Sequence, residues 1–589
     1  MSRFVDPSTK DIIDRLSRSS LSHHEHALDA DRSARAHGYD GLDTPPVPGH
    51  AGGDLTRKSV SDALLQEEPS KPQVRAWDRR WLGLVLHSVV VGVISTVLPL
   101  TVFPFLTNYL NMEGTQTLSA RTMLALPWVL KPFFGIFTDC VPFLCGYHRR
   151  PYVMLGWLMC AASLVSIYFV DLPEPFFTDR SLVGTPLIKM TVEQRKTLNM
   201  DAPSHGGLYV MFMSVATVGY VLADVAADSL ITEIARSQFS VVNINEDEVF
   251  TPVVTKFRYL SMLATFLFMG VSMSGWNYGG DFDFTLKYNE VMLIMGILSA
   301  VPIPFMWCAV VESRRARRSF QKCFKEIWDL FHNRAINKVI LFRFLGGIFG
   351  GISATAVNPV AFYWAGVQPL NDNVVSFVAT AAVIIGLSYA NKRKWNINYR
   401  LLIIGATLVI LFLDCGATMF TIWNIVRSQW FWIGLPVMEA IPSGLDYVIF
   451  TVVLGEIADP GMEQIMSSLV TAVSFLAGPF GLVLSKYLDA KFDVTNQDLM
   501  LDTTHVRFHT TVVFFFAYLC QVISLGWLLV LPRHAAEARE WKKRSGTSTP
   551  HAVGLIVLLV LALGWTLTVH ILSVNASTAC MKITGGVGC

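Results

Sequence analysis

From residue 81 onward, apolar stretches of roughly 20 or more residues alternate with short polar connectors. Each stretch is long enough to cross the roughly 30 Å of hydrocarbon in a bilayer as a helix. The pattern therefore predicts thirteen membrane-spanning helices, in two groups of six with one more at the end. The first group covers about 82–109, 117–143, 152–171, 207–235, 254–276 and 289–311; the second covers about 339–364, 373–391, 400–421, 428–456, 463–488 and 509–532; the last helix covers about 552–573.

Polar segments flank and separate these groups. The first eighty residues lack an apolar core, so we expect a disordered tail rather than a signal peptide. The expected domains are a cytoplasmic tail (1–80), an N-terminal six-helix half (81–311), a basic cytoplasmic connector (312–338), a C-terminal six-helix half (339–532), a basic cytoplasmic segment (533–551), the extra helix (552–573) and a short outer tail (574–589). Two groups of six helices across a basic connector are typical of a major-facilitator-type transporter. The predicted fold is thus an all-α polytopic membrane protein, a 6+6 helix bundle of that type with an extra C-terminal transmembrane helix.

Composition agrees with this fold class. Hydrophobic residues make up 52% of the 589 residues and charged residues 16%, whereas soluble domains carry about a quarter charged residues. The net charge of +2 gives no overall electrostatic support for a nucleic-acid partner. The nine cysteines form no CxxC pair. We find no HExxH or GxSxG motif and expect no helix with paired histidines, so neither an enzyme, a cofactor nor a metal site is predicted.

The distribution of basic residues predicts the orientation of the helices. Connectors with Arg149, Arg150 and the run from Arg314 to Lys325 are expected in the cytoplasm, because positive charge stays inside. The N-terminus is then cytoplasmic, and an odd number of spans places the C-terminus outside. Asn575 begins an Asn-Ala-Ser glycosylation sequon on that outer tail. We expect a multi-pass protein of the plasma membrane.

Two charged residues interrupt the second apolar stretch. Lys131 and Asp139 lie in the sequence LPWVLKPFFGIFTDCVPFLCGYHRRPY, which covers residues 126–152. A lysine in hydrocarbon costs about 3 kcal/mol or more, so it should face the bundle interior, a partner charge or a water-filled path. An ion pair that only locks two helices together is the alternative.

The fourth apolar stretch carries two carboxylates one helical turn apart. Asp224 and Asp228 share a helix face. Two carboxylates in a low dielectric repel each other, which favours protonation of one of them. These residues are therefore candidates for proton coupling. Pairing with a neighbouring helix, with Lys131 as one partner, is the alternative.

Candidate substrate contacts also occur in the second half. Arg343 precedes a glycine-rich run, and Asn358 precedes Pro359, which frees a backbone carbonyl at mid-depth. Glu439 and Asp446 lie in a stretch interrupted by two prolines. Transporters place substrate at interrupted helices with mid-membrane charges, so these four residues are predicted to bind substrate. The alternative for Arg343 is that its long side chain extends toward the membrane surface and places its charge there. The same alternative applies to Lys256 and Arg258 in the fifth stretch.

The motifs that contain these residues resemble the folate–biopterin transporter (BT1) family of the major facilitator superfamily. The matching segments are 127–152, 223–236, 343–359 and 442–460, and the resemblance covers about residues 81–532. It implies proton-driven uptake of a pteridine such as folate or biopterin, with the lipid bilayer as surroundings. Some members carry other solutes, including S-adenosylmethionine, so another solute remains open, as does a receptor that transports nothing.

The chemistry of a folate-like substrate suggests roles for these residues. Lys131 would attract the anionic end of the substrate, and Trp128 would stack on a pterin ring, although plain helix packing is the alternative for Trp128. Asp139 with Arg149 and Arg150 resembles the superfamily's cytoplasmic gating motif.

Overall fold

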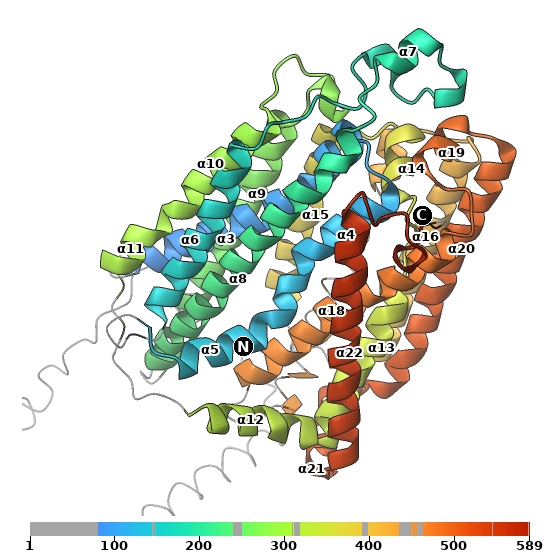
Figure 1. Cartoon of the computed structure of the whole chain (residues 1–589). Helices are drawn as coiled ribbons and strands as arrows, with labels where there is room; N and C mark the ends of the chain where they lie inside the picture. Colours follow the sequence, from blue (N-terminus) through green and yellow to red (C-terminus); the bar gives the residue numbers. More distant parts are fainter. Residues whose placement is uncertain are drawn as a thin grey trace, which may run out of the picture. The chain divides into compact units, whose positions relative to one another are not determined.

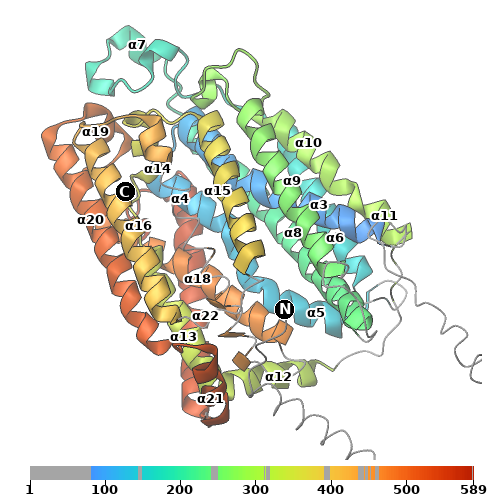
Figure 2. The same ribbon diagram turned by 180° about the vertical axis from the view of Figure 1, so that it is seen from behind.

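The structure is a computed structural model. It describes residues 81–589 except 144–146, 148, 240–249, 309, 311, 313–318, 391–397, 435–443, 445–448, 451–452, 455, 458–462, 545, 587 and 589. The expected tail therefore lies outside the described residues. In the described part every regular element is helical, apart from three isolated β-bridges. Figures 1 and 2 show the helices from opposite sides.

The helices of the first half follow the predicted apolar stretches closely. The second span is divided because Pro127 and Pro132 lack the amide hydrogen that an α-helix needs, and a 3₁₀ turn, Leu126–Leu130, separates its two parts. The elements are α3 (Leu82–Leu100, extended by Val102–Tyr109), α4 (Gly114–Ala125), α5 (Lys131–Cys140), α6 (Arg150–Tyr168), the loop helix α7 (Val192–Lys196), α8 (Ala202–Phe239), α9 (Phe250–Ser272), α10 (Tyr288–Ala300) and α11 (Pro302–Cys308).

The second half begins with an amphipathic helix in the basic connector, α12. The seventh span is broken between residues 351 and 357, where the Thr355 amide donates to the Asp489 carboxylate at 2.7 Å instead of continuing the helix. The elements are α12 (Phe320–His332), α13 (Arg334–Gly351), α14 (Val357–Tyr363), α15 (Pro369–Ala390), α16 (Tyr399–Ile422), α18 (Glu463–Asp489), α19 (Asn496–Leu501), α20 (Thr504–Gly526), α21 (Ala535–Arg544) and α22 (Thr549–Val574).

Nine helices among the described residues are long and apolar enough to cross a membrane. They include α22, which corresponds to the predicted extra helix. Most of the predicted tenth span lies outside the described residues. The all-α polytopic fold expected from the hydropathy pattern is confirmed.

Glycines set the closest helix contacts within each half. In the first half, a Cβ on Gly156 of α6 would lie 2.4 Å from the carbonyl oxygen of Gly219 on α8. In the second half, a Cβ on Gly351 of α13 would lie 2.5 Å from the Cα of Gly478 on α18. Small residues at both positions allow the backbones to approach, as is usual between membrane helices. The glycine-rich run that follows Arg343 thus allows close helix contact at Gly351.

Helices of the two halves also contact one another. The helix α15 packs along α9, as Figure 2 shows, and α18 packs against α5 and the 3₁₀ turn that precedes it. The extra helix α22 packs against both α4 and α18, beside which it lies in Figure 1. It therefore spans a seam between the halves instead of standing apart from them.

Candidate functional site

Four charged side chains from three helices meet in the first half. The Lys131 ammonium at the start of α5 lies 3.1 Å from the Asp228 carboxylate of α8. The guanidinium of Arg258 on α9 lies 2.5 Å from Asp224 and 3.8 Å from Asp228. We call Lys131, Asp224, Asp228 and Arg258 the central cluster. It holds two positive and two negative charges, so it is balanced within itself.

A buried histidine supports the inner side of the central cluster. His87 of α3 is fully buried, and its Nε2 lies 3.8 Å from Asp224 Oδ1. Its Nδ1 accepts a hydrogen bond from Trp157 Nε1 at 2.9 Å. Because Nδ1 is an acceptor, the proton of the neutral ring is on Nε2 and faces the carboxylate. Gly92 allows α9 to lie against α3 here, since a Cβ on Gly92 would be 2.5 Å from the Arg258 carbonyl oxygen.

The two carboxylates differ in their access to solvent. The Asp224 side chain is 1% exposed, whereas Asp228 is 31% exposed and Lys131 is 19% exposed. Each carboxylate faces a cation, so the repulsion expected between them is offset by ion pairing. Asp224 is thus held by Arg258 in the interior, whereas the Lys131–Asp228 pair is partly exposed.

Trp128 connects the central cluster to the second half. The Lys131 ammonium lies 5.4 Å from the centre of its ring, and Trp128 Nε1 donates to the Tyr220 hydroxyl at 3.3 Å. The ring also stacks on Phe475 of α18, with centroids 5.8 Å apart and planes 19° apart. A cation and an aromatic surface are therefore adjacent where two halves meet.

Two of the three predicted gating residues come together. Arg149 binds the Asp139 carboxylate at 3.3 Å and the Glu233 carboxylate at 2.8 Å. Arg150 instead donates to the carbonyl oxygens of Met306 and Trp307 near the end of α11. The backbone amides of both arginines donate to Glu312 at 3.0 Å. The structure thus places Arg149 in a charge network between α5 and α8, and Arg150 at α11.

Arg343 and Asn358, the two predicted substrate residues of the second half that the structure describes, have their printed contacts outside the central cluster. Arg343 of α13 lies 3.5 Å from the ring centre of Phe450 and lines a cavity of about 580 Å³. The lining residues of this cavity come from α13, α16, α18, α20 and the turn after α20, and they include Asp414. Asn358 donates to the Thr117 hydroxyl of α4 at 3.4 Å. Glu439 and Asp446 lie outside the described residues.

The predicted glycosylation site is accessible. Asn575 follows α22 and is exposed, and its side-chain oxygen accepts hydrogen bonds from Ser577 of its own sequon. Cys580 in the same tail is disulfide-bonded.

Comparison with known proteins shows what this chain is similar to. The model of the BT1 family matches residues 91–172, which run from within α3 to just beyond α6 and contain Lys131 and the gating residues. The chain is 22% identical over 438 residues to a folate-biopterin transporter of Synechocystis, which covers 70% of this chain and 76% of that protein. The chain is therefore similar to the BT1 family over residues 91–172, and to a folate-biopterin transporter over most of its length.

Shorter matches and solved structures extend this comparison. Probable folate-biopterin transporter 2 of Arabidopsis thaliana is 41% identical over 62 residues, 10% of this chain and 12% of that protein. Probable folate-biopterin transporter 4 of the same plant is 24% identical over 213 residues, 36% of this chain and 34% of that protein. In fold, the chain is similar to a D-xylose–proton symporter (TM-score 0.50, 13% identity, 77% of this chain and 97% of that one). It has the same TM-score, 0.50, to a variant of the nucleoside transporter NupG, which is 9% identical and is matched over 77% of this chain and 100% of that one. Together these similarities identify a multi-pass membrane transporter with the fold of major-facilitator transporters, and not an enzyme.

Sequence reasoning missed one residue beside the central cluster and interpreted another differently. Arg258 was equally compatible with extension to the membrane surface, but its guanidinium points to Asp224 instead. His87 was not singled out, although it is a polar residue inside the first apolar stretch. The expectation that no helix carries paired histidines is wrong, because His505 and His509 lie one turn apart on α20.

A buried lysine was also missed. Lys486 of α18 is 1% exposed, and its ammonium donates to the hydroxyls of Ser119 on α4 and Ser573 on α22. It also lies 3.2 Å from His570 Nδ1 of α22, whose Nε2 donates to the Pro479 carbonyl oxygen at 3.1 Å. A charged residue in the last turn of an apolar stretch suggests a surface position from sequence alone, but here it joins α4, α18 and α22.

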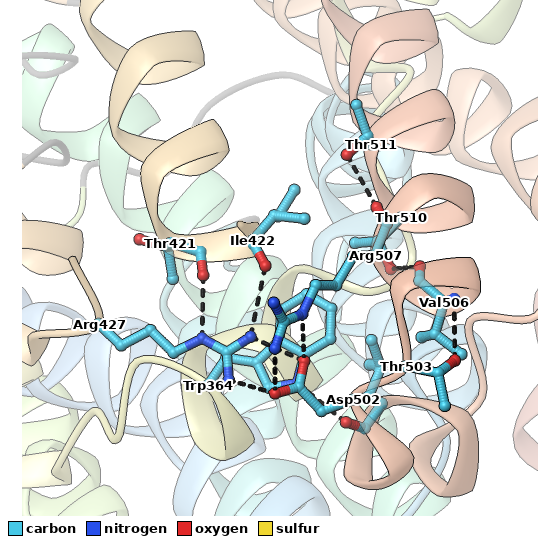
Figure 3. Close-up of polar contacts among 11 residues, drawn as sticks. Trp364, Thr421, Ile422, Arg427, Asp502, Thr503, Val506, Arg507, Thr510 and Thr511 are labelled. Carbon is cyan, nitrogen blue, oxygen red and sulfur yellow. Dashed lines mark hydrogen bonds and ion pairs between the residues drawn. The ribbon is translucent and has the colours of Figure 1, made fainter. Parts of the chain in front are cut away.

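At the end of the helices where α4 begins, polar networks join loops of the protein. Figure 3 shows Arg427 and Arg507 converging on the Asp502 carboxylate, each at 2.8 Å, with Trp364 beside Arg427. Burial tends to raise the pKa of Asp502, but hydrogen bonds and charge from the two arginines outweigh it and lower the pKa to about 2.

A second network at the same end crosses between the halves. The Asn496 side chain donates to the Asn111 and Met112 carbonyl oxygens at 3.2 Å, and its backbone amide donates to Glu113 at 2.9 Å. The Tyr363 hydroxyl donates to the Asn111 side chain. Burial raises the pKa of Glu113 to about 7. The loop before α4 is thereby fixed against the connector between α18 and α20.

Proposed function

We propose that this protein is a secondary active transporter that carries a pteridine, folate or biopterin, together with protons by alternating access. The names of its relatives in Synechocystis and Arabidopsis support the substrate class. The observation that carries the proposal is the Lys131–Asp228 pair, which is partly exposed beside the Trp128 ring. It combines a cation for a carboxylate, an aromatic plane for a pterin, and an acid that can bind a proton.

The pair provides a coupling step with balanced charge. Protonation of Asp228 removes its negative charge and releases the Lys131 ammonium, which then binds a carboxylate of folate or the pterin carbonyl oxygen of biopterin. With folate, the proton and the negative charge of the substrate thus enter the site together, and departure of both restores the original ion pair. Asp224 is too deeply buried for this exchange, so we assign it to positioning Arg258 instead. This refines the proton-coupling role assigned to both carboxylates.

Alternating access requires contacts that open and close on each side. We propose that the halves 81–311 and 339–532 rock about the central cluster. In this scheme the Asp139–Arg149–Glu233 network belongs to the cytoplasmic gate, and the Asn496–Asn111 network closes the opposite side. The basic connectors support a cytoplasmic N-terminus and an outer C-terminus, and we propose residence in the plasma membrane.

One observation favours a second substrate class. Asp228 is more exposed than Lys131, so a cationic solute with a sulfonium or ammonium group, such as S-adenosylmethionine, would pair with Asp228 in place of Lys131. Such a solute would displace the lysine from the carboxylate, and would compete with the proton instead of entering with it. The dependence of uptake on pH therefore distinguishes the two classes.

Uptake of radiolabelled folate and biopterin into cells expressing the protein tests the proposal. We expect saturable uptake that a protonophore abolishes and that Lys131→Ala lowers at least tenfold. Lys189→Ala, at an exposed loop lysine, is the matched control and should leave uptake unchanged. Surface labelling confirms equal amounts of each variant in the membrane. Full uptake by Lys131→Ala would refute the role of the pair, and no pteridine uptake by the unsubstituted protein would refute the substrate class.

A further inference from the structure

Two histidines and an aspartate converge at the end of α20 that faces the connector from α18. His505 and His509 lie four residues apart on α20, so both rings project from the same face of the helix. Asp493, in the connector, places its carboxylate between them. The three ligand atoms all lie within 4.8 Å of one another. The proposed transport function uses none of these residues.

The spacing of the three side chains fits one metal ion. Zinc bonds to imidazole nitrogen and carboxylate oxygen of about 2.0–2.2 Å, at a tetrahedral angle, place the ligand atoms about 3.3 Å apart. Asp493 Oδ2 lies 3.3 Å from His509 Nδ1 and 3.5 Å from His505 Nδ1. The His505 ring is 66% exposed, so a small rotation can complete the triangle without disturbing the helix.

The Nδ1 atom of His509 faces the Asp493 segment. It accepts a hydrogen bond from the backbone amide of Asp493 at 3.1 Å, so a metal bound at Nδ1 would replace this hydrogen bond. Imidazole binds a metal in its neutral form, through the lone pair of its unprotonated nitrogen. Phe492 packs edge-on against the same ring, with centroids 5.4 Å apart, and fixes its orientation.

We propose that Asp493, His505 and His509 form a site for a divalent transition metal of the zinc class. Two imidazoles and one carboxylate leave a fourth position for water, and this donor set suits Zn²⁺, Ni²⁺ or Cu²⁺. Ca²⁺ and Mg²⁺ prefer six or more oxygen ligands, so they do not fit.

The site joins the connector to a helix of the second half. The connector between α18 and α20 also carries Asn496, which binds Asn111 and Met112 of the first half. A metal held by Asp493 and α20 restricts this connector and so favours the arrangement in which Asn496 bridges the halves. On the proposed transport function, on which this step rests, a bound metal therefore slows the opening of that side.

Metal binding to the purified full-length protein tests the site directly. The tail sequence contains His23, His24 and His26, so all three are replaced by alanine in every protein tested, and purification avoids a histidine tag. Added Zn²⁺ should raise the melting temperature, and Co²⁺ should give the visible absorption of a four-coordinate ion.

His505→Ala and Asp493→Asn should each weaken Zn²⁺ binding about 100-fold or more, because a lost ligand costs at least as much as a lost supporting contact. His505 is highly exposed, so its substitution should leave folding intact. His205→Ala, at an exposed histidine near the start of α8, is the matched control and should bind like the parent. Equal Zn²⁺ affinity in the parent, His505→Ala and Asp493→Asn proteins would overturn the proposal, as would absence of binding in the parent.

A separate transport experiment tests the consequence for gating. Zn²⁺ should inhibit pteridine uptake by the parent at least fivefold and leave uptake by His505→Ala unchanged. Inhibition of both proteins alike would refute the gating role while the binding result still decides the site. Absence of pteridine uptake in both proteins without metal would instead refute the proposed substrate.

Discussion

Removal of Arg258 tests whether the central cluster is held by the Arg258–Asp224 pair. We predict that Arg258→Met strongly destabilises the protein, because Asp224 is left buried and without its closest cation. At 2.5 Å and an effective dielectric constant of about 20, the Coulomb attraction is about 7 kcal/mol. Desolvation of the two ions opposes it by several kcal/mol, and removing one partner of such a pair costs about 3–5 kcal/mol.

Thermal unfolding of the purified protein measures this cost. If a half of about 230 residues unfolds as a unit, a loss of 3–5 kcal/mol lowers the melting temperature by roughly 6–10 °C. Lys256→Met is the matched control, because Lys256 is an exposed cation on the same helix, two residues away. We expect it to change the melting temperature by less than about 2 °C, which is typical of a surface position.

A double substitution separates charge from packing. Addition of Asp224→Asn to Arg258→Met removes the uncompensated charge, so it should recover part of the lost stability. The reasoning is refuted if Arg258→Met unfolds at the same temperature as Lys256→Met. Arg258 would then not be paired with Asp224 and would extend to the membrane surface instead. A double variant less stable than Arg258→Met would show that the uncompensated carboxylate is not the cause.

Three further predictions concern the polar ends and the helix contacts. Burial raises the pKa of Glu113 from 4.5 to about 7, so the folded state holds the proton more tightly and loses stability as pH rises between these values. Glu113→Gln should therefore flatten this part of the profile of melting temperature against pH. An unchanged slope would contradict the prediction. Asp502 has a φ of 50°, which asparagine tolerates better than alanine. Asp502→Ala should therefore unfold with about 1 kcal/mol less stability than Asp502→Asn in denaturant titrations, and equal stability would argue against backbone strain. Gly156→Ala should lower the melting temperature because its Cβ meets the α8 backbone, whereas Gly416→Ala, which has open space around it, should not; equal effects would contradict the close α6–α8 packing.

The helices and their order could be predicted from the sequence, because the length of an apolar stretch and the bilayer thickness determine them. Pro127 and Pro132 also indicate where the second span is interrupted, since proline cannot continue the hydrogen-bond ladder. The seventh span is different. Its break between residues 351 and 357 is stabilised by Asp489, which is more than a hundred residues away, so local pattern does not reveal it.

The residues of the site could be identified only in part. Lys131 and Asp228 stand out because charges in apolar stretches are costly, and their pairing was one of the alternatives. The pairing of Arg258 with Asp224 depends on the rotation of α9 about its axis, which a weakly amphipathic stretch does not define. Lys486 is similar, because its partners on α4 and α22 are brought together only by tertiary packing.

The central claim is that Asp228 binds the proton that drives pteridine transport and thereby releases Lys131. The most direct measurement compares two activities of Asp228→Asn in proteoliposomes, pH-gradient-driven accumulation of labelled folate or biopterin and exchange of labelled for unlabelled substrate. The neutral amide mimics the protonated acid, so we predict that exchange continues while accumulation is lost. Asp283→Asn, at an exposed loop carboxylate, should retain both activities. Accumulation by Asp228→Asn at the level of the unsubstituted protein would contradict the account.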